Sequence, residues 1–161
     1  MSWIFPLLTL LATLFGFYLQ RKDYEKSQKP APQIVLGDKD RRLFVQLQNN
    51  GVGPLLVEQL SFLKDDVEYS GIEECLSFDP KSYNHDTEIS PDTPKIVHPG
   101  RDLEIFGMIF EPHEGEEDIS RVRNELACLQ LKVIGKDTYD NKIITKRDFQ
   151  WFTRHTKGIA S

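Results

Sequence analysis

Acidic side chains gather around one of the four histidines in the stretch EPHEGEED, residues 111–118. Carboxylates of this stretch together with His113 could hold a divalent cation, because hard cations prefer oxygen ligands. Their spacing matches no calcium-binding loop, and consecutive carboxylates are typical of a solvated surface. We therefore predict no metal site in this chain.

Two cysteines, Cys75 and Cys128, are the candidate nucleophiles, and both lie among apolar neighbours in the sequence. A reactive cysteine needs a histidine partner and an electropositive setting, so we expect both thiols to pack in a core. The sequence leaves open whether they pair with each other; a disulfide would indicate export from the reducing cytosol. The motifs of serine hydrolases, zinc proteases and phosphate-binding loops are absent. These features predict neither an enzyme nor a bound cofactor.

The stretch NNGVGPLLVE, residues 49–58, could be a glycine-rich phosphate loop or a corner between two strands. A phosphate loop needs free N–H groups that lead into a helix, but Pro54 removes a donor and a strand-like run follows. We therefore interpret Asn49, Gly51, Gly53 and Pro54 as markers of a turn. We expect the two glycines to take positive φ, and Asn49 or Asn50 to brace the bend with a side-chain hydrogen bond.

Short apolar runs with a period of two predict strands on either side of this turn. The predicted strands cover residues 33–37, 42–49, 55–63, 67–70, 102–110, 127–135 and 141–152. Turns are expected at KDD (64–66) and at KDTYDN (136–141), a single helical turn at 71–76, and a short helix at 117–126. Residues 77–94 form a long proline-containing segment whose role the sequence does not give. These signals indicate an antiparallel sandwich, with a barrel as the alternative.

The first 20 residues carry no charged side chain, and they are apolar from residue 3 to residue 19 apart from two threonines. A helix of this length is at the short end of a transmembrane span. The residues assigned to the anchor are Trp3, Phe5, Leu7, Leu11, Phe15 and Tyr18. A cleaved secretory signal is the alternative, but it would need a basic start and a small-residue cleavage site.

Basic residues follow the apolar segment closely, and none precedes it; they are Arg21, Lys22, Lys26 and Lys29. Such a basic collar stays in the cytoplasm, so we predict an inner-membrane protein with its N-terminus outside and its body inside. Residues 30–161 hold 16 basic and 23 acidic side chains, a net charge of −7. An acidic body argues against nucleic acid as a partner.

Three turn motifs, NNGVGP, HPGRDLEIF (98–106) and KDTYDN, resemble those of bacterial immunoglobulin-like domains, although Leu55 stands where alanine usually follows the Gly-Pro. The resemblance is to single-pass membrane proteins with such a domain. It implies a mainly β fold, in which an N-terminal transmembrane helix precedes an antiparallel immunoglobulin-like β-sandwich with one or two short helices. The expected organisation is an anchor (1–20), a basic juxtamembrane linker (21–32), the sandwich (33–152) and a flexible tail (153–161).

These features predict a membrane-anchored protein whose cytosolic sandwich is a protein-interaction or assembly module in a membrane-associated complex. Its expected partners are lipid, through the N-terminal helix, and an unidentified protein; self-association is a further possibility. The alternative is an effector of bacterial anti-phage defence whose β-domain senses a small ligand or nucleotide. That alternative rests on a loose resemblance to small defence effectors, which carry more than one span.

Overall fold

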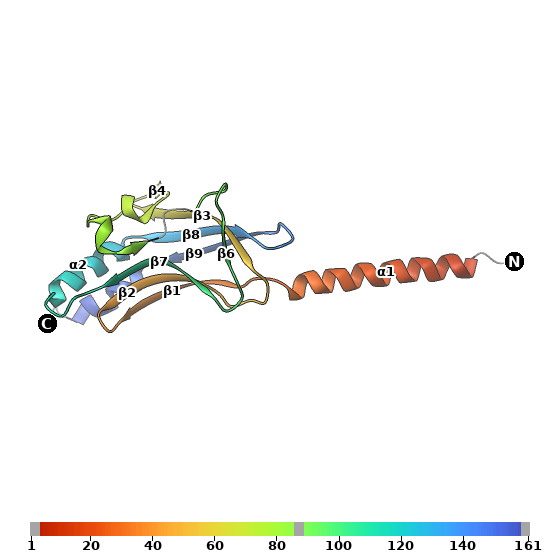
Figure 1. Cartoon of the computed structure of the whole chain (residues 1–161), viewed down its shortest axis with the longest axis horizontal. Helices are drawn as coiled ribbons and strands as arrows, with labels where there is room; N and C mark the ends of the chain where they lie inside the picture. Colours follow the sequence, from red (N-terminus) through yellow and green to blue (C-terminus); the bar gives the residue numbers. More distant parts are fainter. Residues whose placement is uncertain (1–3, 86–88, 159–161) are drawn as a thin grey trace.

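The computed structural model describes residues 4–85 and 89–158 and is mainly β, as predicted. It contains two antiparallel sheets, and two α-helices: α1 (Ile4–Ser27) and α2 (Glu116–Ala127). Figure 1 shows α1 projecting alone from one end of the strands, while α2 lies at the other end. Residues 32–158, which hold both sheets, are called the β-domain below.

The strands separate into two sheets, and neighbouring strands run antiparallel in both. One sheet has the order β1 (Pro32–Lys39), β2 (Arg42–Asn49), β7 (Asp102–Ile109) and β5 (Asn84–His85). The other has the order β4 (Val67–Tyr69), β3 (Leu55–Lys64), β8 (Gln130–Lys136) and β9 (Lys142–Asp148), and β6 (Lys95–Val97) also pairs with β3. Strands β1 and β9 lie beside each other where the two sheets meet.

Tight turns with left-handed residues join consecutive strands. Asp40 and Arg41 have φ values of 52° and 60° between β1 and β2, and Asp65 and Asp66 have values of 49° and 62° between β3 and β4. Two consecutive positive φ values make the hairpin turn whose twist matches that of the strands. The turn predicted at 64–66 is therefore confirmed, and so is the turn that joins β8 to β9.

Both sheets contribute to one hydrophobic core. On β2 every second residue is fully buried, as its alternation predicts, and on β8 the residues at 131 and 133 are buried in the same way. Four phenylalanines are the largest fully buried side chains: Phe62, Phe106, Phe149 and Phe152. The last two belong to the segment around η3 (Gln150–Gly158), a 3₁₀-helix that packs beside α2.

Helix α2 is tied to the first sheet by a buried ion pair. Arg123 donates to both oxygens of Asp38 on β1, at 2.8 and 3.0 Å, and the two side chains are 10% and 8% exposed. Glu116 also accepts a hydrogen bond from Arg123. The helix extends through Ala127, so β8 begins at Gln130 and the strand expected at 127–135 starts too early.

The predicted segment 77–94 holds short regular elements, which are η2 (Pro80–Ser82) and β5, and residues 86–88 lie outside the described part of the chain. The helical turn expected at 71–76 is η1 (Ile72–Glu74). Strand β6 has no counterpart among the predictions, because three residues are too few to show a period.

Within residues 4–85 and 89–158, no helix combines the length and the apolarity needed to cross a membrane. This finding does not support the transmembrane span predicted for residues 1–20. Helix α1 continues past its apolar part into the charged sequence RKDYEKS and ends at Ser27, before Pro30, as the sequence predicts. Trp3 lies outside the described residues.

Candidate functional site

The strongest site in this chain is the junction between helix α1 and the β-domain, formed by residues 28–31 and the loop 49–53. Only four residues, 28–31, separate the end of α1 from the start of β1. They lie against the loop: the N–H groups of Val52 and Gly53 donate to the Lys29 carbonyl at 3.3 and 3.4 Å. Pro30 is buried at this contact. The connection is therefore held by hydrogen bonds along its length.

Asn49 is the centre of the junction, and its side chain is fully buried. Its amide nitrogen donates to the carbonyls of Gly53 (2.8 Å) and Val97 (2.9 Å). Its amide oxygen accepts from the N–H groups of Ala31 and Gly51, both at 3.1 Å. Two donors and two accepted bonds use the full capacity of an asparagine side chain. The bracing that the sequence assigned to Asn49 or Asn50 belongs to Asn49, since Asn50 bonds Gln33 at the surface.

The two glycines of the loop are needed for close approach. A Cβ on Gly53 would lie 1.8 Å from the carbonyl oxygen of Gln28, and one on Gly51 would lie 2.4 Å from the Lys29 oxygen. The expectation of positive φ at Gly51 and Gly53 is wrong, because Gly100 is the glycine for which the described residues show it. The glycines are small so that two backbones can touch, and they do not serve a left-handed bend.

A third segment, residues 97–101, completes the junction. The N–H of Asn49 donates to the Arg101 carbonyl at 3.0 Å, and the N–H of Gly100 donates to the Asn49 carbonyl at 2.8 Å. Gly100 has a φ of 69°, which fits the turn expected at His-Pro-Gly. Pro54 follows the loop, half-buried, immediately before β3. The sequence motifs NNGVGP and HPG therefore meet in space.

The turn between β8 and β9 lies close enough to the junction for Lys29 to act on Asp137. Asp137 is buried and accepts bonds from the N–H groups of Tyr139 (2.8 Å) and Asn141 (2.9 Å) and from the Asn141 side chain (2.9 Å). Burial alone raises the pKa of Asp137, but the bonds from Asn141 and Tyr139 and the charge of Lys29 outweigh it. The pKa of Asp137 is therefore held below its ordinary value.

The residues predicted for the anchor line the apolar half of α1, where their side chains lie in the open. Phe5, Leu7, Leu11, Phe15 and Tyr18 are 58–77% exposed. Further exposed apolar residues complete this half of the helix, namely Leu8, Leu10, Leu14, Phe17 and Leu19. No face of the helix is polar over this stretch, so the helix has no side that favours contact with water.

The basic collar occupies the second half of α1. Arg21 pairs with Glu25 at 3.2 Å, one helical turn away, and the Lys22 ammonium lies 5.9 Å from the centre of the Tyr18 ring. Lys26 is exposed in the last turn, and Lys29 belongs to the junction. The structure thus brings Lys29 together with Asn49, Gly51 and Gly53, and it leaves the other three basic residues on the helix.

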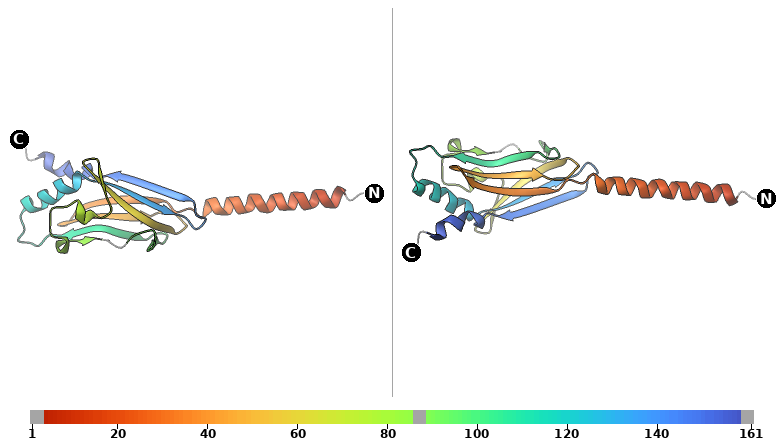
Figure 2. Two further views of the ribbon diagram at one scale, coloured as in Figure 1. Left: turned by 90° about the horizontal axis from the view of Figure 1, so that it is seen from above. Right: turned by 90° about the horizontal axis from the view of Figure 1, so that it is seen from below.

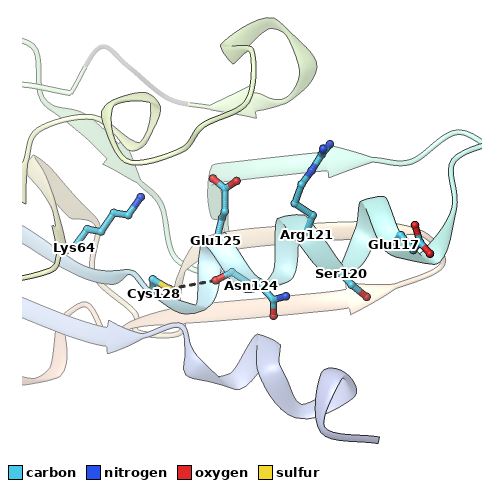
Figure 3. Close-up of a pocket in the computed structure, with 7 residues that line it drawn as sticks. All are labelled: Lys64, Glu117, Ser120, Arg121, Asn124, Glu125 and Cys128. Atoms are coloured by element: carbon cyan, nitrogen blue, oxygen red, sulfur yellow. Dashed lines mark hydrogen bonds between the residues drawn. The ribbon is translucent and has the colours of Figure 1, made fainter. Parts of the chain in front are cut away.

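An open pocket of about 600 Å³ lies between α2 and the end of β3 (Figure 3). Its lining residues are Lys64, Glu117, Ser120, Arg121, Asn124, Glu125 and Cys128. Two charged groups of this pocket already have partners: Lys64 donates to the Cys75 carbonyl at 2.6 Å, and Glu125 accepts from the N–H of Ser77 at 2.8 Å. No histidine lines this pocket, so it offers no base to a thiol.

Both cysteines are free. Cys75 is buried, as predicted, and burial raises the pKa of its thiol to about 11. Cys128 is exposed at the end of α2, so the prediction of core packing is wrong for this residue. The apolar neighbours that suggested a core position, Leu126, Ala127 and Leu129, are themselves buried while the thiol points outward.

The acidic stretch 111–118 has local structural roles. The guanidinium of Arg41 donates to the carbonyls of Glu111 and Glu114, at 2.6 Å each, and the N–H of Gly115 donates to Asp118 at 3.2 Å. Glu116, Glu117 and Asp118 form the first turn of α2, where negative charge favours a helix. In the described part of the chain, no three potential metal ligands of the His, Cys, Asp and Glu types come together.

The junction connects two parts of the chain, and its side chains do not form a catalytic set. It joins an uncovered apolar helix to a β-domain through a short connection whose backbone is bonded on both sides. Sequence reasoning found Asn49 and the glycines, but missed their partners at Val97 and Arg101, which lie some fifty residues away in the chain. No local pattern could have indicated that these carbonyls receive the bonds.

Comparison with models of protein families found no match for this chain, and comparison with curated protein sequences found none either.

Proposed function

We propose that this chain is a membrane-anchored protein, with α1 as its lipid-embedded element and the β-domain as a cytosolic interaction or assembly module. The observation that carries the proposal is the exposure of the apolar half of α1. Ten large apolar side chains between Phe5 and Leu19 are 45–77% exposed and contiguous. Soluble proteins rarely leave so large an apolar patch open to water.

Covering the apolar half of α1 is energetically favourable. Covering a large apolar side chain completely stabilises a protein by about 1.5–3 kcal/mol, so covering these ten stabilises it by on the order of 10 kcal/mol. Lipid covers a helix from every side, and a partner protein covers one stripe. Because the apolar residues of α1 surround the helix, lipid is the covering that matches them.

The charges of α1 support an orientation. Basic residues follow the apolar half closely, which is the pattern of a segment whose C-terminal side stays in the cytoplasm. Anionic lipid headgroups would attract this collar, and they would hold off the acidic remainder of the chain. We therefore place the protein at the inner membrane with the β-domain in the cytoplasm.

The two antiparallel sheets around one core, together with the meeting of the NNGVGP and HPG turns, support an immunoglobulin-like sandwich as the finer description of the β-domain. Such domains serve many functions, so the function has to be argued from the site. The absence of a reactive set of side chains from the junction agrees with a module that binds and positions.

Reconstitution into liposomes tests the anchor. We expect the full chain to float with liposomes on a density gradient and to resist extraction at alkaline pH. Leu11→Lys should abolish flotation, because it places a charge in the apolar half of α1. Tyr24→Lys, at an equally exposed position in the charged half, should float as the original chain does. A full chain that stays monomeric and soluble without lipid or detergent would refute the anchor.

The two free cysteines provide a test of sidedness, because one is exposed and one is buried. A maleimide that cannot cross membranes should label Cys128 only after cells are opened, if the β-domain is cytosolic. Cys75 should stay unlabelled until the protein is denatured. Labelling of Cys128 in intact cells would reverse the orientation.

A further inference from the structure

The outer face of the β4–β3–β8–β9 sheet carries lysines in matched pairs. Side chains alternate along β8 and β9, so every second one points away from the core. The register places Lys132 opposite Lys146, Ile134 opposite Ile144 and Lys136 opposite Lys142. We call these six residues, together with Glu58 on β3 and Glu68 on β4, the lysine face. Ile144 is half exposed at its centre.

The charges on the lysine face are sorted across its width. The carboxylates on β3 and β4 form ion pairs with the lysines of β8. Glu58 lies 2.9 Å from Lys136, and Glu68 lies 3.7 Å from Lys132. The lysines of β9 make no ion pair with any described residue. The β3 and β4 side of the face therefore carries two carboxylates, and β9 carries two lysines without an ion pair among the described residues, with Asp148 at the end of that strand.

Like charges opposite each other in a sheet are destabilising. Two such pairs, Lys132 with Lys146 and Lys136 with Lys142, are present on a chain whose residues 30–161 have a net charge of −7. The exposed isoleucine row between them makes the face apolar at its centre and charged at its sides. Protein interfaces have the same anatomy, with an apolar centre and a polar rim.

The direction of the strands restricts what can cover this face. Strands β8 and β9 run roughly along the direction in which α1 projects, as Figure 1 and both views of Figure 2 show. A membrane that holds α1 lies beyond the end of these strands, so it cannot cover the broad side of the sheet. Two copies anchored in one membrane share the direction of α1, and only a twofold axis along that direction relates them symmetrically.

Such an axis over β8 makes the lysine face complementary to itself. Rotation by half a turn keeps the direction of the strands and reverses their order, so β9 of one copy lies on β3 and β4 of the other. Lys142 and Lys146 then lie opposite the partner copy's carboxylate side, and Ile134 lies opposite its own equivalent. We propose that the lysine face is the contact of a parallel homodimer whose twofold axis follows α1.

The inference rests on the proposed function, because it takes from it the membrane that aligns the two copies. Strands β3, β8 and β9 together span about 14 Å in width, and the seven residues of β8 span about 23 Å in length, which gives an area below the roughly 800 Å² per partner of a standard interface. Confinement of both helices to one bilayer raises the effective concentration and supports so small a contact. The dimer should therefore weaken as protein is diluted in lipid.

A disulfide across the axis tests the contact in liposomes that hold the full chain. In a Cys128→Ser background, Ile134→Cys should crosslink two copies under mild oxidation, since the axis brings this position next to itself. Ile109→Cys provides the matched control, because this isoleucine of β7 is 69% exposed on the other sheet. Equal crosslinking at both positions, or crosslinking at Ile109 alone, would overturn the proposal.

A charge exchange makes the test specific. Lys142→Glu with Lys146→Glu gives a face that is acidic on both sides, and Glu58→Lys with Glu68→Lys gives one that is basic on both sides. Each variant alone should give at least tenfold less crosslinked dimer through Ile134→Cys. A mixture of the two should recover it as a heterodimer, which also shows that both variants fold.

Each failure points to one of the two proposals. A chain that does not float with liposomes refutes the anchor and removes the basis of the dimer. A chain that floats but shows no crosslink at Ile134→Cys refutes the lysine face alone. A crosslinking yield that is the same in the charge-exchange variants would mean that the helices associate without this face. That result would also overturn the proposal.

Discussion

Replacing Asn49 by alanine is the sharpest test of the junction. The side chain is fully buried and holds three separate segments of backbone: the connection at Ala31, its own loop at Gly51 and Gly53, and the strand at Val97. Alanine keeps the backbone bonds of residue 49 and deletes the four side-chain bonds. The expected result is a β-domain of lower stability whose connection to α1 opens.

The magnitude follows from where the four orphaned groups lie. The carbonyls of Gly53 and Val97 belong to buried residues, and each loses a bond that water cannot easily replace, at about 1.5 kcal/mol apiece. The N–H groups of Ala31 and Gly51 lie nearer the surface, and hydration limits their loss to about 0.5 kcal/mol each. The free energy of unfolding should therefore fall by about 4 kcal/mol, a large share of the 5–15 kcal/mol typical of a domain.

Urea unfolding of the full chain in detergent measures this change. Fluorescence of Trp151 reports on the β-domain when Trp3 is replaced by phenylalanine. With a slope of about 2 kcal/mol per molar urea, the midpoint should fall by about 2 M. Hydrogen exchange should accelerate at the amides of Ala31 and Gly53, which are bonded within the junction.

Asn50→Ala supplies the matched control. This neighbouring asparagine is exposed and makes one side-chain bond, to Gln33 at 2.9 Å. Its replacement should cost less than about 0.5 kcal/mol. If Asn49→Ala and Asn50→Ala shift the midpoint equally, the four-bond clamp does not hold the junction and the reasoning fails.

Three further predictions concern other points of the molecule. Gly53→Ala should lower the free energy of unfolding by about 1–3 kcal/mol, because the new methyl group meets a backbone carbonyl at 1.8 Å; urea midpoints measure this. Arg123→Met should cost about 3 kcal/mol in the same assay, since it removes the guanidinium from the buried Asp38 carboxylate. Asp137→Asn should destabilise most at neutral pH. The pKa of Asp137 is lowered by folding, so its ionised form contributes stability above about pH 4, and that stability is lost as the pH falls through the folded-state pKa.

Each of these predictions has a control in the chain. Gly16→Ala places its methyl group in open space on α1 and should leave the midpoint unchanged. Arg121→Met loses an exposed contact of 3.8 Å to Asp118, which is worth less than about 0.5 kcal/mol. For Asp137→Asn, a stability deficit that stays constant from pH 7 to pH 3 would show that the carboxylate charge is not involved.

The strands were predictable wherever the period of two was long enough. Strand β2 was expected at 42–49 and is found there, because its side chains alternate between the core and the other face of the sheet. Strand β3 was placed to within one residue. The start of β8 was missed by three residues, since Leu126, Ala127 and Leu129 suit the end of a helix and the start of a strand equally. Helix continuation and strand initiation compete there, and long-range packing decides.

The candidate site was predictable in part. Asparagine and glycine in NNGVG indicated a turn with a side-chain brace, and Asn49 provides that brace. The role of the glycines was misjudged because a sequence reports the freedom of a glycine and does not report what approaches it. The carbonyl of Gln28 comes within reach only after the chain has folded.

The shortness of the connection has a consequence for direction. A helix that enters a domain through four bonded residues transmits its rotation, so the number of residues in α1 sets the angle at which the β-domain faces its neighbours. One residue inserted after Leu19 would turn the β-domain by about 100° around the helix axis and raise it by about 1.5 Å. Seven inserted residues would return it to within about 20° of its starting angle. The contact between copies should follow this helical phase, being lost with one added residue and recovered with seven.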